Sequence, residues 1–150
     1  IRTPNTTEAA MLLNEPLNLC SADMSSQQAK SILARLSEMG PKIVVITGTV
    51  VNGRTMNIGY DRETSRFWKV PYVQVPAQYP GTGDIFAAVL TGSIMKGESL
   101  PIAMDLATAF LELVIKTTYS YGTEPREGVM LEKCLGFLTG VQNLCDYDRL

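Results

Sequence analysis

The segment YPGTGDIFAAVL at residues 79–90 combines groups that could perform phosphoryl transfer. Gly81, Thr82 and Gly83 precede an apolar run, and glycines let the backbone approach a ligand because they lack a Cβ. The start of a helix leaves N–H groups unpaired and carries roughly half a positive charge, which favours anions. Asp84 follows directly and could accept the proton of an attacking hydroxyl group. Alternatively, these residues form a plain tight turn in which Asp84 only stabilises the helix terminus.

A second group of interest lies in TPNTTE, at residues 3–8. Asn5 and Glu8 are three residues apart, in the predicted first turn of a helix that follows a short strand. Ligands of open α/β sheets bind at the carboxyl ends of strands, and an amide with a carboxylate there could organise Mg²⁺ through water molecules. The alternative is structural, because Asn5 is a good N-cap and Glu8 could complete a capping box.

A third group ends the apolar run VVITGT at residues 44–49. Thr47 and Gly48 are expected at the carboxyl end of a buried strand, where a hydroxyl group beside a glycine can contact phosphate. An ordinary turn at the end of a strand would explain the same two residues.

These groups need helices and strands to position them. Capping and turn signals predict one helix after Asn5 and further helices over residues 27–39, 82–96, 100–118 and 127–138. The apolar run at 42–47 lacks alternation, which predicts a parallel strand covered on both faces. Residues 61–65 predict the polar tip of an antiparallel hairpin, with Arg62 in solvent. The order predicts one α/β domain over residues 1–150, with helices on a mixed, mostly parallel sheet.

The composition excludes several classes of function. The 150 residues are 45% hydrophobic and carry a net charge of −2, so no general attraction to nucleic acid or to anionic membranes is expected. The sequence has no histidine, which excludes histidine-based catalysis and metal binding. Cys20, Cys134 and Cys145 form no CxxC pair and predict reduced thiols, packed as small apolar groups in a cytoplasmic protein. Acidic residues interrupt the most apolar segment, 100–115, so no membrane helix is predicted.

Three motifs in this order resemble the ribokinase-like superfamily of small-molecule kinases, and pyridoxal kinases in particular. They are TPNTTEA at 3–9, IVVITG at 43–48 and PGTGDIFAAVLTG at 80–92, and the likeness spans nearly the whole chain. Sugar kinases of this superfamily usually have alanine at the position of Thr82, and hydroxymethylpyrimidine kinases often have cysteine at that of Asp84. The resemblance implies a ribokinase-like α/β fold. Because Ile1 reads as part of a strand already under way, we expect the N-terminal part of the fold to be absent.

The resemblance implies a catalytic role for the last motif. Asp84 would be the base that takes the proton from the hydroxymethyl group of pyridoxal, pyridoxine or pyridoxamine. The backbone of Gly81, Thr82 and Gly83 would form the anion hole for the transferred phosphate. Without its N-terminal half, the chain alone is expected to have little or no activity.

The other two motifs would serve the nucleotide. Asn5 and Glu8 would organise Mg²⁺ and its waters, and Thr47 and Gly48 would contact the phosphates of ATP. The implied cofactors are ATP and Mg²⁺, with the use of a monovalent cation left open, and the implied assembly is a homodimer. Two alternatives stand beside this hypothesis: a hydroxymethylpyrimidine or sugar kinase of the same superfamily, and a non-catalytic nucleotide-binding module.

Overall fold

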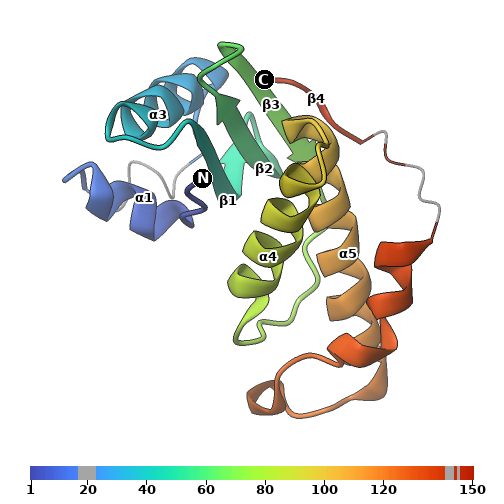
Figure 1. The fold of residues 1–150 in the computed structure, drawn as a ribbon. Coiled ribbons are helices and arrows are strands. Elements are labelled where there is room, and N and C mark those ends of the chain that lie inside the picture. Colours follow the sequence, from blue (N-terminus) through green and yellow to red (C-terminus); the bar gives the residue numbers. More distant parts are fainter. Residues whose placement is uncertain (17–22, 141–143, 145) are drawn as a thin grey trace. The chain divides into compact units, whose positions relative to one another are not determined.

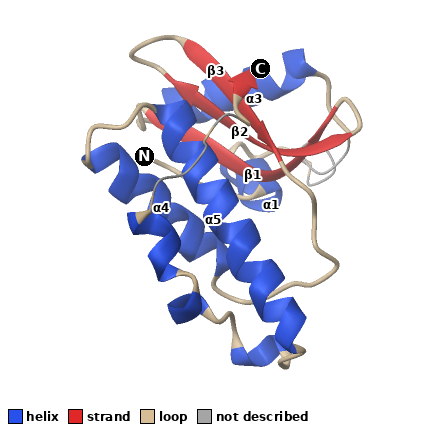
Figure 2. Cartoon of the chain, turned by 90° about the vertical axis from the view of Figure 1, so that its right-hand side faces the viewer, coloured by secondary structure: helices blue, strands red, loops and turns tan. Residues whose placement is uncertain are grey.

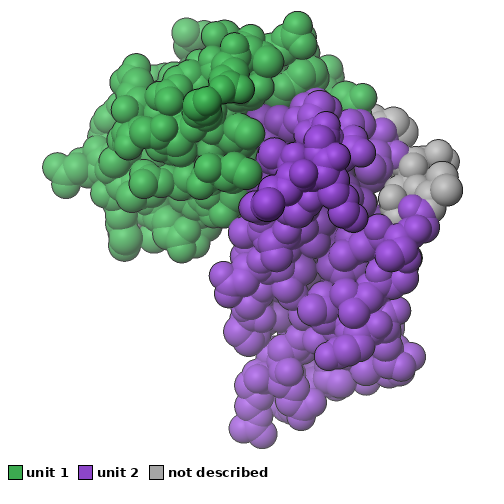
Figure 3. Space-filling model, viewed as in Figure 1, with its two compact units in different colours: residues 1–72, 146–150 green, residues 73–145 purple. Residues whose placement is uncertain are grey.

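The computed structural model describes residues 1–16, 23–140, 144 and 146–150 (Figure 1). The chain forms two compact units (Figure 3): unit 1 comprises Ile1–Tyr72 and Asp146–Leu150, and unit 2 comprises Val73–Cys145. Among the helices of these described ranges, none is long and apolar enough to cross a membrane. Cys134 is a buried free cysteine, as predicted, whereas Cys20 and Cys145 lie outside the described residues.

The described residues of unit 1 form a four-stranded sheet in the order β1-β2-β3-β4 with two helices, so the predicted α/β fold is confirmed. Its strands are β1 (Ile43–Val51), β2 (Arg54–Asp61), β3 (Arg66–Pro71) and β4 (Asp148–Arg149). Its helices α1 (Thr6–Leu12) and α3 (Ser26–Glu38) both pack against β1. Asn5 caps α1 and Ser25 caps α3, each in a capping box.

The prediction of a mostly parallel sheet is wrong, because all the paired strands of unit 1 run antiparallel. β1 does not end at Thr47 but continues to Val51 and turns back through Asn52 and Gly53. Both turn residues have positive φ, 49° and 74°, as the tightest antiparallel hairpins require. Outside residues 17–22, 141–143 and 145, parallel pairing is limited to isolated bridges, which join Arg2 to Val44, Asn5 to Thr47 and Met24 to Val51.

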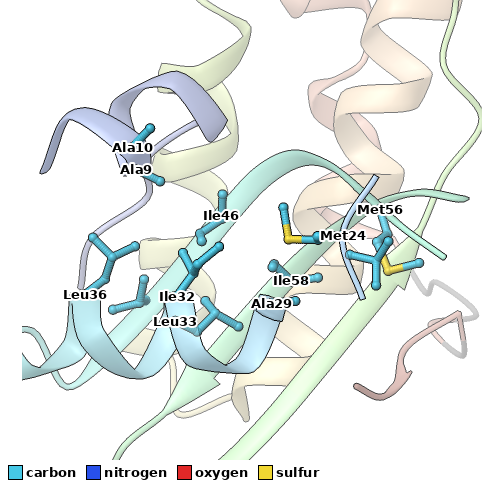
Figure 4. Close-up of a cluster of buried hydrophobic side chains, with 12 residues drawn as sticks. Ala9, Ala10, Met24, Ala29, Ile32, Leu33, Leu36, Ile46, Met56 and Ile58 are labelled. Carbon is cyan, nitrogen blue, oxygen red and sulfur yellow. The ribbon is translucent and has the colours of Figure 1, made fainter. Parts of the chain in front are cut away.

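The core of unit 1 lies between its helices and the sheet (Figure 4). Ile32, Leu33 and Leu36 fall on one face of α3, at the helical spacing predicted from the sequence. They pack with buried residues of α1, β1 and β2, which include Ala9, Ala10, Val44, Ile46, Met56 and Ile58. The predicted hairpin of β2 and β3 extends this sheet, and Val70 of β3 is fully buried. This core supports the start of α1 and the middle of β1, where the candidate residues of unit 1 lie.

Unit 2 is built on two helices that pack side by side (Figure 2): α4 (Thr82–Met95) and α5 (Leu100–Tyr121). Both were predicted, and α5 extends to a C-cap at Gly122. The predicted helix over residues 127–138 is wrong. That region instead forms the 3₁₀ turns η1 (Pro125–Glu127), η2 (Leu131–Lys133) and η3 (Leu135–Thr139). Gly128 interrupts it with φ 78° and ψ −163°, and apolar side chains of the turns pack on Phe110 and Val114.

Candidate active site

The start of α4 presents backbone N–H groups to solvent. Gly81 is the N-cap, and its φ of 82° lies in the left-handed region that glycine adopts without strain. No side chain in the described part of the chain caps this helix, and the first helical hydrogen bond runs from Ile85 N to Gly81 O, at 3.1 Å. The amides of residues 82–84 therefore have no acceptor within the helix. A Cβ built on Gly81 or Gly83 would meet no atom within 4 Å, so the space over this turn is open.

The turn is held in place by the protein interior. The hydroxyl group of Thr82 donates to the backbone oxygen of Tyr79 at 3.1 Å, and Tyr79 is buried. Farther along α4, Phe86 and Leu90 are buried, at 1% and 0% exposure. N–H donors held in this way need little reorganisation when negative charge develops in a reaction, which is the requirement for an anion hole.

Asp84 lies in the first turn of α4, and its side chain is exposed. A carboxylate at this place is stabilised by the positive end of the helix dipole. Because it is exposed beside the amides of residues 82–84, it can reach a ligand bound over them. The geometry fits both the predicted general base and a simple helix-terminal charge.

In unit 1, the structure brings the other two motifs together. Thr47 N donates to Pro4 O at 3.1 Å, and Asn5 and Thr47 form a parallel bridge. The candidate Mg²⁺ residues, at the start of α1, therefore lie beside the candidate phosphate residues Thr47 and Gly48. All four belong to unit 1, whereas residues 81–84 belong to unit 2.

The predicted capping alternative for Asn5 and Glu8 is confirmed. Asn5 N donates to Glu8 Oε2 at 3.0 Å, and Glu8 N donates to Asn5 Oδ1 at 2.8 Å. Capping and metal binding are compatible, because an ionised carboxylate offers about four acceptor positions. The described residues contain no group of three or more Asp, Glu, Cys or His that could hold a metal alone. Mg²⁺ that keeps several waters and is bridged by substrate phosphates needs only one or two carboxylates, and the exposed Glu8 fits this arrangement.

An open groove of about 530 Å³ lies beside Glu8 in unit 1. Its lining consists of Arg2, Thr3, Pro4, Glu8, Met11 and Leu12. Nη1 of Arg2 is buried without a hydrogen-bond partner among the described residues. The groove thus places one positive and one negative side chain next to the capping box.

Thr47 and Gly48 do not form the strand-ending turn that we predicted as their structural alternative. They form an irregularity within β1, where the register with β2 shifts between Ile46 and Thr49. Gly48 has φ 71° and is exposed, and its N–H donates to Oδ1 of Asn57 at 3.2 Å. Sequence reasoning missed Asn57, although a buried amide between the apolar Met56 and Ile58 of a strand is a detectable signal.

Comparisons with known proteins identify the family of this chain. The family model of phosphomethylpyrimidine kinase matches residues 1–128. Pyridoxal kinase of Arabidopsis thaliana is 30% identical over 121 residues, which make up 77% of this chain and 37% of that protein. Pyridoxal kinase PdxY of Deinococcus radiodurans is 25% identical over 82% of this chain and 42% of its own length. The chain thus spans well under half the length of these relatives.

Solved structures share the fold. A Bacteroides thetaiotaomicron protein, provisionally named a phosphomethylpyrimidine kinase, matches with a TM-score of 0.92 and 42% identity over 99% of this chain and 50% of its own. An orthorhombic crystal form, solved with pyridoxal, matches with a TM-score of 0.90 and covers 52% of that chain. Pyridoxal kinase of Lactobacillus plantarum matches with a TM-score of 0.75 and 28% identity over 91% of this chain and 48% of its own. The expected ribokinase-like fold is confirmed, and the chain belongs to the phosphomethylpyrimidine kinase family.

Proposed function

We propose that the protein carrying this chain is an ATP-dependent kinase of pyridoxal, pyridoxine or pyridoxamine, and that this chain supplies its phosphate-handling residues. The observation that carries the proposal is the uncapped start of α4, where open backbone amides adjoin the exposed carboxylate of Asp84. Phosphoryl transfer needs these two features: fixed donors for the equatorial oxygens and an acceptor for the hydroxyl proton.

In the proposed reaction, Asp84 accepts the proton of the substrate hydroxymethyl group. The resulting oxygen attacks the γ-phosphorus of ATP, the bond to the β–γ bridging oxygen breaks, and ADP leaves with that electron pair. The amides of residues 82–84 donate to the oxygens of the phosphoryl group during transfer. An aspartate is basic enough for this role, because a loose transition state demands proton removal only late in the reaction.

Unit 1 would bind the nucleotide phosphates. Thr47 and Gly48 would contact them, and Asn5 and Glu8 would hold Mg²⁺ through its waters. When bound, Mg²⁺ would neutralise charge on the phosphates. Glu8 can serve both the helix cap and the cation shell, since the capping bond uses only one lone pair of its carboxylate. The homodimer, the cytoplasmic location and the low activity of the isolated chain stay predictions.

Two observations favour a B6 vitamer as the substrate. The two curated relatives are named pyridoxal kinases, and the 42% identical Bacteroides relative was crystallised with pyridoxal. The name of the matching family supports a second candidate, a hydroxymethylpyrimidine kinase. Asp84 favours the first candidate, because the resemblance associates cysteine at this position with many hydroxymethylpyrimidine kinases.

Steady-state kinetics of the full-length protein would test the proposal, with ATP and three acceptor classes: B6 vitamers, hydroxymethylpyrimidine and sugars. We expect kcat/KM to be highest for a B6 vitamer. A higher kcat/KM for hydroxymethylpyrimidine or for a sugar would show that this acceptor, and not a B6 vitamer, is the preferred substrate. No phosphorylation of any acceptor, with ATP still bound, would instead indicate the non-catalytic module.

A further inference from the structure

We propose that Asn57 is a positioning residue, whose side chain holds Gly48 in the conformation that receives a nucleotide phosphate. The inference deepens the proposed function and rests on it, since it concerns the phosphate contact assigned to Thr47 and Gly48. Asn57 lies in the interior of β2 and is only 5% exposed. A buried side-chain amide in a strand needs hydrogen-bond partners, and one partner of Asn57 is the exposed Gly48.

The backbone around Gly48 has the form of a β-bulge. The flanking pairs of the β1–β2 ladder are Ile46 with Ile58 and Thr49 with Met56. Thr47 and Gly48 therefore lie together opposite Asn57 alone, and two residues opposite one is the definition of a bulge. Bulges bend a strand and re-aim its side chains, and they are common beside active sites. Here the bulge contains the two residues that were selected as phosphate contacts from the sequence alone.

Asn57 supplies the acceptor that the bulge requires. The N–H of Gly48 donates to its Oδ1 at 3.2 Å, so a side chain of β2 takes the place of a backbone acceptor. Gly48 also has a φ of 71°, a conformation that is strained for other residues. The nearest atom to a Cβ built at Gly48 would be the Tyr72 hydroxyl oxygen, at 3.9 Å, so the outer side of the bulge is open.

Fixing Gly48 in advance would favour nucleotide binding for an entropic reason. A turn already held in its binding conformation loses less freedom when phosphate binds, and this raises affinity. Removal of the Asn57 acceptor would let the exposed N–H of Gly48 turn to water. The expected loss is in nucleotide affinity, whereas the affinity for the phosphate acceptor should not change.

The chain offers a matched control in Thr49. Its hydroxyl group donates to Met56 O at 2.7 Å, and Thr49 is fully buried. This bond also joins a side chain to the backbone across β1 and β2, next to the bulge, but it does not involve Gly48. Thr49→Val therefore removes a comparable hydrogen bond and leaves the Gly48 acceptor intact.

The test compares Asn57→Ala, Asn57→Asp and Thr49→Val in the full-length protein, with KM measured separately for ATP and for pyridoxal, and Tm measured for each variant. We expect Asn57→Ala to raise the KM for ATP by about 3- to 10-fold, the equivalent of one lost hydrogen bond, with an unchanged KM for pyridoxal. Asn57→Asp keeps an acceptor for Gly48 but buries a carboxylate, which should lower Tm and, by repulsion of the phosphate, also raise the KM for ATP. Thr49→Val should lower Tm without a selective change in either KM.

Each outcome either supports or overturns the proposed role of Asn57. A folded Asn57→Ala protein with an unchanged KM for ATP would overturn the inference. It would also be overturned if Asn57→Ala raised the KM for ATP and the KM for pyridoxal equally and Thr49→Val had the same effect. If Asn57→Ala does not fold, Asn57→Ser decides, because serine is too short to replace Oδ1 as the acceptor for Gly48, and an unchanged KM for ATP then overturns the inference. A wild-type protein that phosphorylates no acceptor would refute the proposed function itself, and the role of Asn57 with it.

Discussion

Asn5 and Glu8 cap each other's backbone N–H groups across the first turn of α1, at 3.0 and 2.8 Å. Asn5 also bridges Thr47 at the edge of β1. The same pair of residues thus fixes the start of a helix and holds it beside the candidate phosphate residues. A structural role and a metal-binding role can coexist here, and substitutions can separate them.

Glu8→Gln should separate the cap from the charge. Glutamine can still accept from Asn5 N in a capping box, so the free energy of unfolding should change by only a few tenths of a kcal/mol. The lost charge should raise the Mg²⁺ concentration needed for half-maximal activity of the full-length protein by about 10-fold or more. Glu8→Ala is the comparison, because it should show the same Mg²⁺ effect and also lose about 0.5–1.5 kcal/mol of stability, the typical contribution of one hydrogen bond. Identical Mg²⁺ dependence in wild type and Glu8→Gln would exclude Glu8 from the metal site.

Gly83→Ala should separate stability from activity at the start of α4. Alanine favours a helix over glycine by about 0.8–1 kcal/mol, and a Cβ at this position meets no protein atom within 4 Å. Thermal unfolding should therefore show equal or higher stability. Turnover should fall, because the methyl group would occupy space assigned to the phosphate.

Gly81→Ala is the counterpart of this variant. The φ of 82° should make alanine cost about 1–2 kcal/mol in stability as well as activity. Full activity of a stable Gly83→Ala protein would contradict the assignment of the amides of residues 82–84 as an anion hole.

Leu33→Ala should destabilise unit 1. Leu33 is fully buried in the cluster of α3 with β1 and β2, and its truncation leaves a cavity that typically costs about 2–5 kcal/mol. Urea unfolding measures this loss. Ser31→Ala is the matched control, since Ser31 is exposed on the same helix and its substitution should change stability by less than about 0.5 kcal/mol. Equal midpoints for the two variants would show that the cluster is not the core.

Local signals predicted much of this fold from the sequence. Apolar spacing and a serine cap predicted α3, and long apolar runs predicted α4 and α5, each within a few residues of its observed bounds. The hairpin of β2 and β3 was also predicted, since a polar tip separates two strand-like runs. Asn5, Glu8 and residues 81–84 lie at helix starts, as expected, whereas Thr47 and Gly48 lie in a bulge within β1 and not at the expected strand end.

What was missed depended on contacts between distant residues or on an overlooked turn. Asn52-Gly53 is a strong hairpin signal, and its recognition would have shown that β1 continues past Thr47. Arg62 is exposed, as predicted, but its guanidinium group also donates to the backbone oxygens of Ser37 and Gly40 at the end of α3, which was not predicted. No local sequence pattern predicts hydrogen bonds between residues so far apart in the chain.

The wrong prediction of a helix over residues 127–138 has a similar origin. The apolar residues of 127–138 have helical spacing, but packing on Phe110 and Val114 is satisfied by short turns around Gly128. Tertiary packing thus overrode local periodicity there. At Asn57, the amide between two apolar residues was a local signal, but its role as acceptor for Gly48 follows only from the pairing of β1 with β2.

The turnover number of Asp84→Asn in the full-length protein tests most directly whether Asp84 is the catalytic base. The amide keeps the size and exposure of the side chain but cannot serve as the base. We expect kcat to fall at least about 100-fold, while the KM values for ATP and for the acceptor stay within about three-fold. Glu98→Gln, at an exposed acid elsewhere in unit 2, should leave kcat unchanged. A kcat of Asp84→Asn within about two-fold of wild type would contradict the assignment of Asp84 as the catalytic base.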